Sequence, residues 1–153
     1  MWVHWRKVIF LSFPFEEITS ETDRNTFMER SVTWLYTITL HSPYWFIGSS
    51  YNSCVLLKNT SSTSINVTPT IYYQGGSYTV TSAPAGAGWN DFPTIPAHQA
   101  RFFTVSGYRS YLNGAKYGGM ELSHTGAPGS LVATTTTLSG KTGLSFDVPF
   151  ETK

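Results

Sequence analysis

The charged residues of this chain are gathered in a few places, and this limits what the chain can fold into. Residues 1–36 hold nine of the nineteen Lys, Arg, Asp and Glu residues in the whole sequence. Residues 31–57 contain none, and residues 59–90 contain none. These uncharged stretches are rich in Thr, Ser, Gly, Tyr and β-branched residues, which favour strands and turns. The sequence therefore predicts a strand-helix extension, residues 1–40, followed by a mainly β domain, residues 41–153.

Short β-prone runs follow one another through the second part, at a spacing of roughly ten residues. This spacing is typical of an antiparallel β-sandwich, here with seven or eight strands. Pro69 predicts an edge strand or a bulge, because proline cannot donate a hydrogen bond to a neighbouring strand. Gly75-Gly76 predicts a two-residue hairpin turn, and Thr134–Thr137 predicts a strand with threonines on both faces. The expected strands are 51–58, 64–73, 77–81, 100–105, 119–123, 131–138 and 144–150.

The extension contains signals for one strand and one helix. Residues 7–13 form a continuous apolar run that Pro14 closes, as in a strand covered on both faces of a parallel sheet. Ser20 and Asp23 have the spacing of a helix capping box. A single strand and helix cannot build an independent core. The residues expected on one helical face are Phe27, Met28, Val32, Leu35 and Tyr36, with Glu29 and Arg30 opposite.

Charge and composition argue against several classes of protein. The net charge is +1, and no Lys/Arg cluster exceeds the Arg6-Lys7 pair, so the basic face that nucleic-acid binding requires is not expected. The first apolar run is far below the roughly 20 residues that span a bilayer, and Glu16-Glu17 stand where a secretion signal needs small residues. The single cysteine, Cys54, leaves no internal disulfide and is expected to be a small buried residue.

Three segments of the extension resemble the closing strand and helix of a flavodoxin-like α/β domain. They are residues 8–16, Asp23-Arg24 and Met28–Arg30. Such domains occur in secreted bacterial hydrolases and related proteins. None of the family's catalytic positions lies in these segments, so the resemblance implies no activity. It implies that the chain begins inside a larger protein's upstream domain.

Five segments of the β part are similar to immunoglobulin-like accessory domains of secreted bacterial proteins. They are residues 56–61, 67–72, 95–98, 119–129 and 146–150. The resemblance implies an immunoglobulin-like sandwich in an extracellular or cell-surface protein. Such domains have no agreed biochemical activity, so what the resemblance implies is a fold rather than a reaction.

Aromatic residues beside amides and carboxylates form the most interesting set of potential ligand contacts. Exposed rings of this kind bind pyranose faces by apolar stacking supported by hydrogen bonds. A glycine-rich loop places one tryptophan beside Asn and Asp, and a glycine-containing stretch holds three tyrosines. The predicted sugar-binding residues are Trp89, Asn90, Asp91, Tyr108, Tyr111 and Tyr117. The alternative is that these rings fill the interior of the sandwich.

Catalytic and metal sites are weaker hypotheses. Glu121 and Ser123 should share one strand face while His124 points the other way, which spoils a simple nucleophile–base pair. A metal site built from His98, Glu121 and His124 would need the fold to bring two segments together. Gly118-Gly119 and the glycines near residue 126 lack the features of a phosphate loop. No cofactor is predicted.

The leading hypothesis is a non-catalytic extracellular or cell-surface module for attachment or spacing, with carbohydrate binding as its sharpest form. Its partner would be a glycan or a protein surface. A first alternative is a self-assembling surface-layer or filament subunit that associates through its edge strands, where little charge opposes pairing. A second alternative is a metal-dependent enzyme that uses His98, Glu121 and His124.

Overall fold

The computed structural model describes residues 18–36, 38–83 and 89–152. The chain divides into two compact units, Met1–Thr37 and Ile38–Lys153. The second unit starts slightly before the boundary at residue 40 that the sequence predicted, because its first strand already begins at Ile38. None of the helices among the described residues is long and apolar enough to cross a membrane.

The described part of the first unit contains helix α1 (Glu21–Tyr36). The Ser20 hydroxyl accepts a hydrogen bond from the Asp23 backbone N–H at 3.2 Å, so the predicted N-cap is confirmed. Met28 is 47% exposed. The predicted strand at residues 7–13 and the side chains of residues 32–36 lie outside the described residues, so the expected apolar face of the helix is not described in full.

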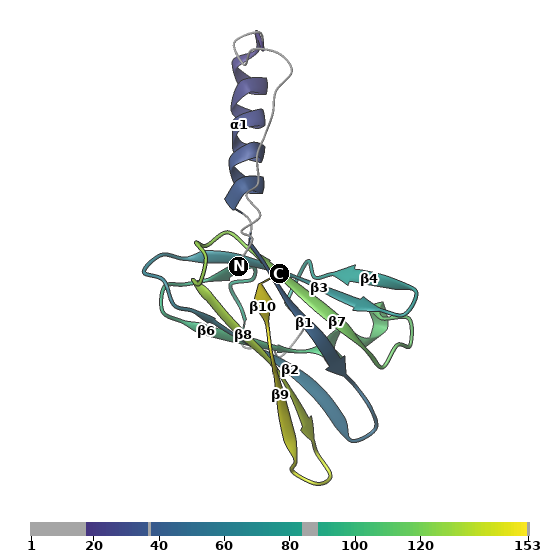
Figure 1. Ribbon diagram of the computed structural model, residues 1–153. Helices are drawn as coiled ribbons and strands as arrows, with labels where there is room; N and C mark the ends of the chain where they lie inside the picture. Colours follow the sequence, from purple (N-terminus) through teal and green to yellow (C-terminus); the bar gives the residue numbers. More distant parts are fainter. Residues whose placement is uncertain (1–17, 37, 84–88, 153) are drawn as a thin grey trace, which may run out of the picture. The chain divides into compact units, whose positions relative to one another are not determined.

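The second unit is mainly β and consists of antiparallel strands in two sheets (Figure 1). Sheet A has the order β10-β1-β7-β3-β4, and the short β5 also pairs with β3. Sheet B has the order β6-β2-β8-β9. The strands are β1 (Ile38–Phe46), β2 (Tyr51–Asn59), β3 (Ile65–Tyr73), β4 (Gly76–Thr79), β5 (Thr94–Ile95), β6 (Ala100–Thr104), β7 (Tyr117–His124), β8 (Leu131–Ser139), β9 (Ser145–Pro149) and β10 (Glu151–Thr152), and the short helix η2 (Val105–Tyr111) follows β6.

Each of the seven expected strands corresponds to an observed strand, with ends that differ by a few residues. Alternating burial along β2, β3 and β8 explains this agreement, since every second residue is buried in each of them. Thr135 and Thr137 are buried while Thr134 and Thr136 are only partly covered. The predicted threonine strand with threonines on both faces is therefore confirmed.

One long strand was missed. β1 contains Tyr44, Trp45 and Phe46, and it was not among the expected strands. Its burial alternates less clearly, because the pairing with β7 shifts between Ser42 and Trp45. The shift inserts one extra residue into β1, which is the pattern of a β-bulge. Trp45 beyond the bulge is fully buried.

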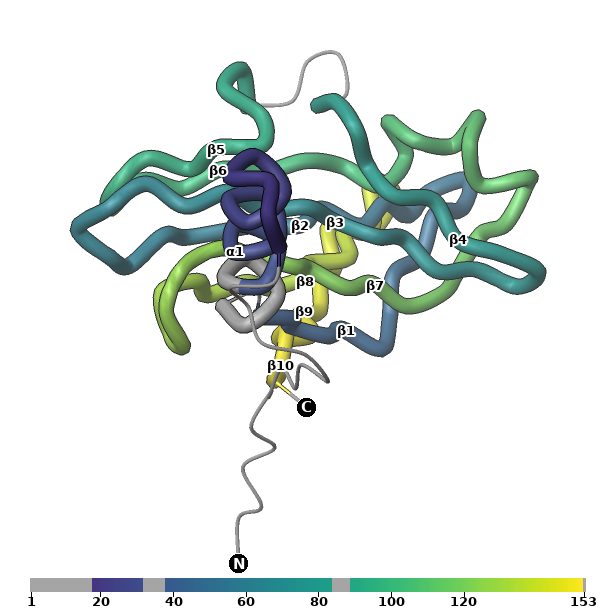
Figure 2. Tube along the Cα trace, turned by 90° about the horizontal axis from the view of Figure 1, so that it is seen from above, coloured from purple at the N-terminus to yellow at the C-terminus, as the bar shows by residue number. Residues whose placement is uncertain are grey.

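The prediction of an edge strand or a bulge at Pro69 is wrong. β3 lies inside sheet A, and it runs beside β7 in both views (Figures 1 and 2). On its other side β3 pairs first with β5 and then with β4. The Pro69 carbonyl accepts a hydrogen bond from the Val80 N–H, at 2.9 Å. In an antiparallel strand the N and C=O of one residue point to the same side. The Pro69 nitrogen, which carries no hydrogen, therefore faces the gap between β5 and β4. The hydrogen bonds between β3 and β7 do not need it.

The predicted hairpin between β3 and β4 exists, but its turn is shifted by one residue. Tyr73 pairs with Gly76, so the two turn residues are Gln74 and Gly75 rather than Gly75 and Gly76. Gly75 has a φ of +94°, a backbone conformation that favours glycine. The positive φ therefore selects Gly75 for the turn, while Gly76 belongs to the strand.

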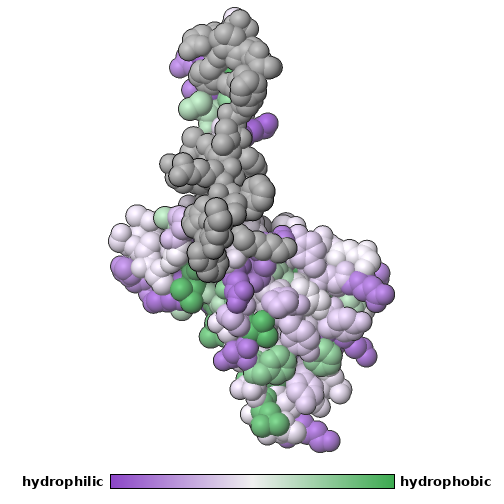
Figure 3. All heavy atoms as spheres, viewed as in Figure 1, coloured by the Kyte–Doolittle hydropathy of each residue, from purple (hydrophilic) through white to green (hydrophobic). Residues whose placement is uncertain are grey.

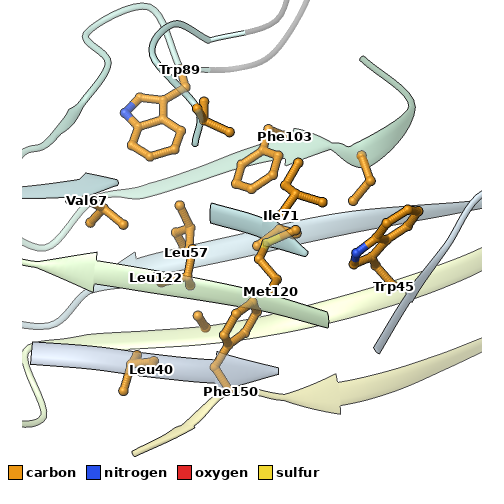
Figure 4. Close-up of a cluster of buried hydrophobic side chains, with 14 of the residues drawn as sticks. Leu40, Trp45, Leu57, Val67, Ile71, Trp89, Phe103, Met120, Leu122 and Phe150 are labelled. Carbon is orange, nitrogen blue, oxygen red and sulfur yellow. The ribbon is translucent and has the colours of Figure 1, made fainter. Parts of the chain in front are cut away.

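One core joins the two sheets (Figure 4). On the face shown in Figure 3, hydrophobic residues of the β unit form separate patches among polar ones. The C-terminal strands β9 and β10 link the two sheets at one side, because β9 pairs with β8 of sheet B and β10 pairs with β1 of sheet A. The buried Phe150 lies between β9 and β10 in the sequence. The core side chains of sheet A include Leu40, Trp45, Val67, Ile71, Met120 and Leu122, and those of sheet B include Val55, Leu57, Phe103, Leu131 and Ala133.

Buried hydroxyl groups connect β1 to β2 and β8 inside the core. The Ser53 hydroxyl accepts from the Phe46 N–H at 2.8 Å and donates to the Phe46 carbonyl at 3.1 Å. It also lies 2.7 Å from the Thr137 hydroxyl. The Thr135 hydroxyl donates to Ser42 at 3.4 Å. These bonds satisfy polar groups that would otherwise destabilise the interior.

Candidate functional site

Trp89 does not present a face to solvent, so the prediction that its ring is exposed is wrong. Its side chain is fully buried, and its indole N–H donates to the Thr94 carbonyl at 2.9 Å. The ring packs beside Phe92, with centroids 4.8 Å apart, and beside Phe103, with centroids 6.1 Å apart. Figure 4 shows Trp89 and Phe103 in the core. Burial of the Trp89 ring stabilises the fold, because an aromatic side chain removes a large apolar area from water.

The three tyrosines of the predicted set occupy different environments. Tyr108 is buried; its hydroxyl donates to the Ser82 carbonyl at 3.0 Å, and burial raises its pKa. Tyr111 is 55% exposed and stacks on Tyr78, with centroids 4.4 Å apart. Tyr117 is 58% exposed and belongs to β7 rather than to a loop. Ring contacts link Trp89, Phe103, Tyr108, Tyr78 and Tyr111 in series. Of the predicted rings, Trp89 and Tyr108 therefore belong to the core, whereas Tyr111 and Tyr117 are exposed.

The two polar neighbours of Trp89 are exposed. Both carboxylate oxygens of Asp91 accept hydrogen bonds from the Arg101 guanidinium, at 2.8 and 2.7 Å. This contact lowers the pKa of Asp91 and joins the β5 loop to β6. Asp91 therefore helps to fix the position of this loop. Asn90 is adjacent in sequence to Trp89, whose ring is buried.

His98, Glu121 and His124 are not brought together. Glu121 lies on the outer face of β7, whereas His124 is 1% exposed and faces the interior, so the predicted alternation is confirmed. His98 is exposed in the turn before β6. Within the described ranges, no group of three His, Cys, Asp or Glu side chains could hold a metal ion. The predicted metal site does not form, because Glu121 and His124 are three residues apart on one strand and so face opposite sides of the sheet.

His124 makes the stability of the fold depend on pH. Neither of its ring nitrogens has a hydrogen-bond partner, and burial lowers its pKa below the usual 6.5. As the pH falls below about 6.5 the unfolded chain binds a proton there and the folded chain does not, so stability falls by up to about 1.4 kcal/mol per pH unit until the lower folded pKa is reached.

We expect His124→Leu to remove this dependence. Between pH 7.5 and 5.5, urea denaturation should show a loss of stability smaller than that of the unaltered chain, by an amount of up to about 1 kcal/mol. His98→Asn, which removes an exposed histidine at a φ of +57° that Asn tolerates, is the control. Equal pH dependence in His124→Leu and the unaltered chain would contradict the prediction.

A hollow lined by both polar and apolar residues lies on the outer face of sheet A, and the sequence did not predict it. Its volume is about 470 Å³, and side chains of β1, β3, β7 and β10 line it. Glu121 lines it and contacts two other lining residues: one carboxylate oxygen is 3.0 Å from His41 Nδ1, and the other accepts a hydrogen bond from the Tyr72 hydroxyl at 2.7 Å. We call these three side chains the sheet A triad.

Strand register brings the triad together. His41 of β1 is the direct partner of Glu121 of β7, and Glu121 is the partner of Thr70 on β3, two residues from Tyr72. Directly opposed residues of antiparallel strands share a face, and diagonal neighbours remain within reach of long side chains. Glu151 of β10 is the other partner of His41, so a second carboxylate lies at this hollow.

Trp45 fixes the backbone beneath the triad. Its indole N–H lies 3.0 Å from the Tyr72 carbonyl and 2.9 Å from the Gly119 carbonyl, so one donor from β1 contacts both β3 and β7. The indole passes over Gly118, where a Cβ would stand 1.9 Å from the Tyr72 carbonyl oxygen. A side chain at residue 118 would therefore separate the strands that carry the triad.

The side chains of the triad are accessible hydrogen-bonding groups. His41 is 24% exposed and Glu121 is 31% exposed, and the Tyr72 ring is 40% exposed. The hydrogen bond to Glu121 raises the pKa of Tyr72, so this hydroxyl remains a donor at neutral pH. Ser42 also lines the hollow, but it is buried and donates to the Tyr44 carbonyl at 3.4 Å.

Only one member of the triad was singled out from the sequence. Glu121 was grouped with His98 and His124, while His41 and Tyr72 carried no signal of their own. The alternation in β7 placed Glu121 on the face opposite to His124, but its neighbours depend on which strands pair. Residues 41, 72 and 121 meet only when β7 lies between β1 and β3.

No protein-family model matches this chain, and neither a curated protein nor a solved structure matches it.

Proposed function

We propose that this chain is a non-catalytic, immunoglobulin-like β-sandwich module for attachment or spacing at a cell surface, and that it binds carbohydrate in the hollow of sheet A. The observation that carries the proposal is the sheet A triad, in which a carboxylate is held between a tyrosine hydroxyl and an imidazole on three neighbouring strands. Strand register orients all three groups before a ligand arrives. Preorganisation of this kind lowers the entropic cost of binding.

The chemistry of the hollow suits a neutral sugar. Carboxylate oxygens accept hydrogen bonds from sugar hydroxyls, and the half-exposed Tyr72 ring offers an apolar face beside them. Among the described residues no Lys or Arg lines the hollow, whereas Glu121 and Glu151 both do. An acidic ligand would be repelled there, so the proposal is restricted to uncharged glycans.

We expect Glu121→Gln to weaken glycan binding by at least about tenfold, because it removes the charge from a hydrogen-bond acceptor that lines the hollow. An array of neutral oligosaccharides would identify a ligand, and calorimetry would compare the variants. Asp147→Asn is the matched control, since it removes an exposed carboxylate of β9 that does not line the hollow. Absence of binding to every neutral glycan, or equal loss in both variants, would overturn the proposal.

Self-assembly is the second function that a specific observation favours. Leu56, Phe102 and Val132 on the outer face of sheet B are 48%, 43% and 56% exposed, and Leu56 is the direct partner of Phe102. They line an apolar hollow of about 260 Å³. Sedimentation of the preparation used for the glycan array separates the two functions: an oligomer that binds no glycan supports assembly, and a monomer that binds one supports the carbohydrate module.

A further inference from the structure

Three cationic side chains gather around the turn that joins β1 to β2. Arg109 comes from η2, Lys141 from the β8–β9 turn, and Lys116 from the segment before β7. Arg109 and Lys141 line a cleft of about 650 Å³, and Arg109 and Lys116 line an adjoining hollow of about 220 Å³. The two hollows share Gly48 and Ser49 as well as Arg109. We call the pair of hollows the basic cleft.

The charge of the basic cleft is unbalanced. Residues 38–83 and 89–152 contain five Lys or Arg residues and four Asp or Glu residues. Three of these five cations line the basic cleft, and none of the four acids does. In the described parts of the chain, Arg109, Lys116 and Lys141 form no salt bridge, whereas Arg101 pairs with Asp91 and Lys58 donates to the His98 carbonyl. Like charges held close together without a counterion attract an anion.

The walls of the basic cleft are fixed by hydrogen bonds. The Asn52 side chain donates to the Ser106 hydroxyl at 2.8 Å, which joins β2 to η2. The Gly140 N–H donates to the Ser50 carbonyl at 2.7 Å, which joins the β8–β9 turn to the β1–β2 turn. The Ile47 N–H donates to the Lys116 carbonyl at 2.7 Å, which joins the segment before β7 to the end of β1. Each segment that carries a cation is therefore held to β2 or to the β1–β2 connection.

The polar residues among the others that line the cleft are three serines and Asn52; the rest are Tyr51, small residues and the apolar side chains of Ile47 and Leu138. Ser49 is exposed, and the Tyr51 ring is 41% exposed at the same cleft. Hydroxyl groups bind a polyhydroxylated ligand, and the tyrosine offers a face on which a sugar ring can stack. Three cations are too few to follow a nucleic-acid backbone, which requires an extended basic surface.

We propose that the basic cleft binds an acidic saccharide, a sugar chain carrying a sulfate or carboxylate group. The oxyanion pairs with Arg109, whose planar guanidinium can donate two parallel hydrogen bonds to it, and Lys141 and Lys116 add positive charge on either side. Tyr51 and the serine hydroxyls contact the sugar. This site does not depend on the sheet A triad, because no residue lines both.

The test compares a sulfated dextran oligosaccharide with unsulfated dextran of the same length, by calorimetry on the full chain. We expect the sulfated form to bind at least about tenfold more tightly, and to bind more weakly as salt rises. The double variant Arg109→Gln/Lys141→Gln should lose that preference. Arg30→Gln/Lys58→Gln removes the same net charge outside the basic cleft and should keep it.

Two further measurements sharpen the result. Arg109→Lys/Lys141→Arg preserves the charge and should retain most of the binding that the glutamine variant loses, and circular dichroism checks that each variant is folded. Glu121→Gln should leave the affinity for sulfated dextran unchanged, which separates this site from the sheet A triad. Equal binding by both double glutamine variants, no preference for the sulfated chain, or complete displacement by an equal concentration of inorganic sulfate would overturn the proposal.

Discussion

Trp45→Ala is expected to lower the free energy of unfolding by about 3–5 kcal/mol, the range found when a large buried aromatic side chain is truncated. The indole is fully buried between the sheets (Figure 4). Its removal leaves a cavity, and it also removes the donor that lies within 3.0 Å of the Tyr72 and Gly119 carbonyls. Urea denaturation followed by circular dichroism would measure the loss.

Two companion variants separate packing from hydrogen bonding at Trp45. Trp45→Phe keeps most of the apolar contact but leaves two carbonyls without a donor, so we expect a smaller loss of roughly 1–3 kcal/mol. Leu144→Ala removes an apolar side chain that is 70% exposed and should change stability by less than about 0.5 kcal/mol. A loss in Trp45→Ala no larger than that in Leu144→Ala would contradict the assigned role of the indole.

The second large effect is expected for Gly118→Ala, which should destabilise the fold by about 3 kcal/mol or more because it forces overpacking against backbone. The added Cβ would stand 1.9 Å from the Tyr72 carbonyl oxygen and 2.9 Å from Trp45 Nε1. Neither atom is the end of a flexible side chain, so relief requires β3 and β7 to move apart. Denaturation in urea, with circular dichroism as the probe, is again the measurement.

Gly140→Ala is the matched control for this substitution. Its added Cβ would meet only the Ser50 carbonyl oxygen at 3.8 Å, which is ordinary van der Waals contact. We expect a change within about 1 kcal/mol, of either sign. Because Trp45 and Gly118 act on the same carbonyl, Trp45→Phe should cost less in the Gly118→Ala background than in the unaltered chain. Additive losses would show that the two residues act separately.

The elements of this fold were predictable where local chemistry decides them. The Ser20 cap depends on the three residues that follow it, and the strands β2, β3 and β8 show the two-residue period of a half-buried sheet. β1 was missed because its bulge interrupts that period. The burial of Trp89 was also missed: a loop tryptophan has the same local sequence whether its ring faces solvent or the core.

The sites were less predictable than the strands. Glu121 was assigned to the strand face opposite to His124, but its partners His41 and Tyr72 come from strands that are distant in sequence. The basic cleft draws its cations from η2 and from two turns. Each cation is isolated in the sequence, so no local pattern indicates that they converge.

The sequence by itself determined that the chain carries a helix with a serine cap and then a series of antiparallel strands, because side-chain alternation and turn residues act over a few neighbours. Only the tertiary structure decided which strands are adjacent, which aromatic rings are buried and which charges meet. Adjacency and register depend on how whole strands pack over the shared core, since a strand's own pattern fixes its faces and leaves its neighbours open. The sheet A triad and the basic cleft both depend on that choice.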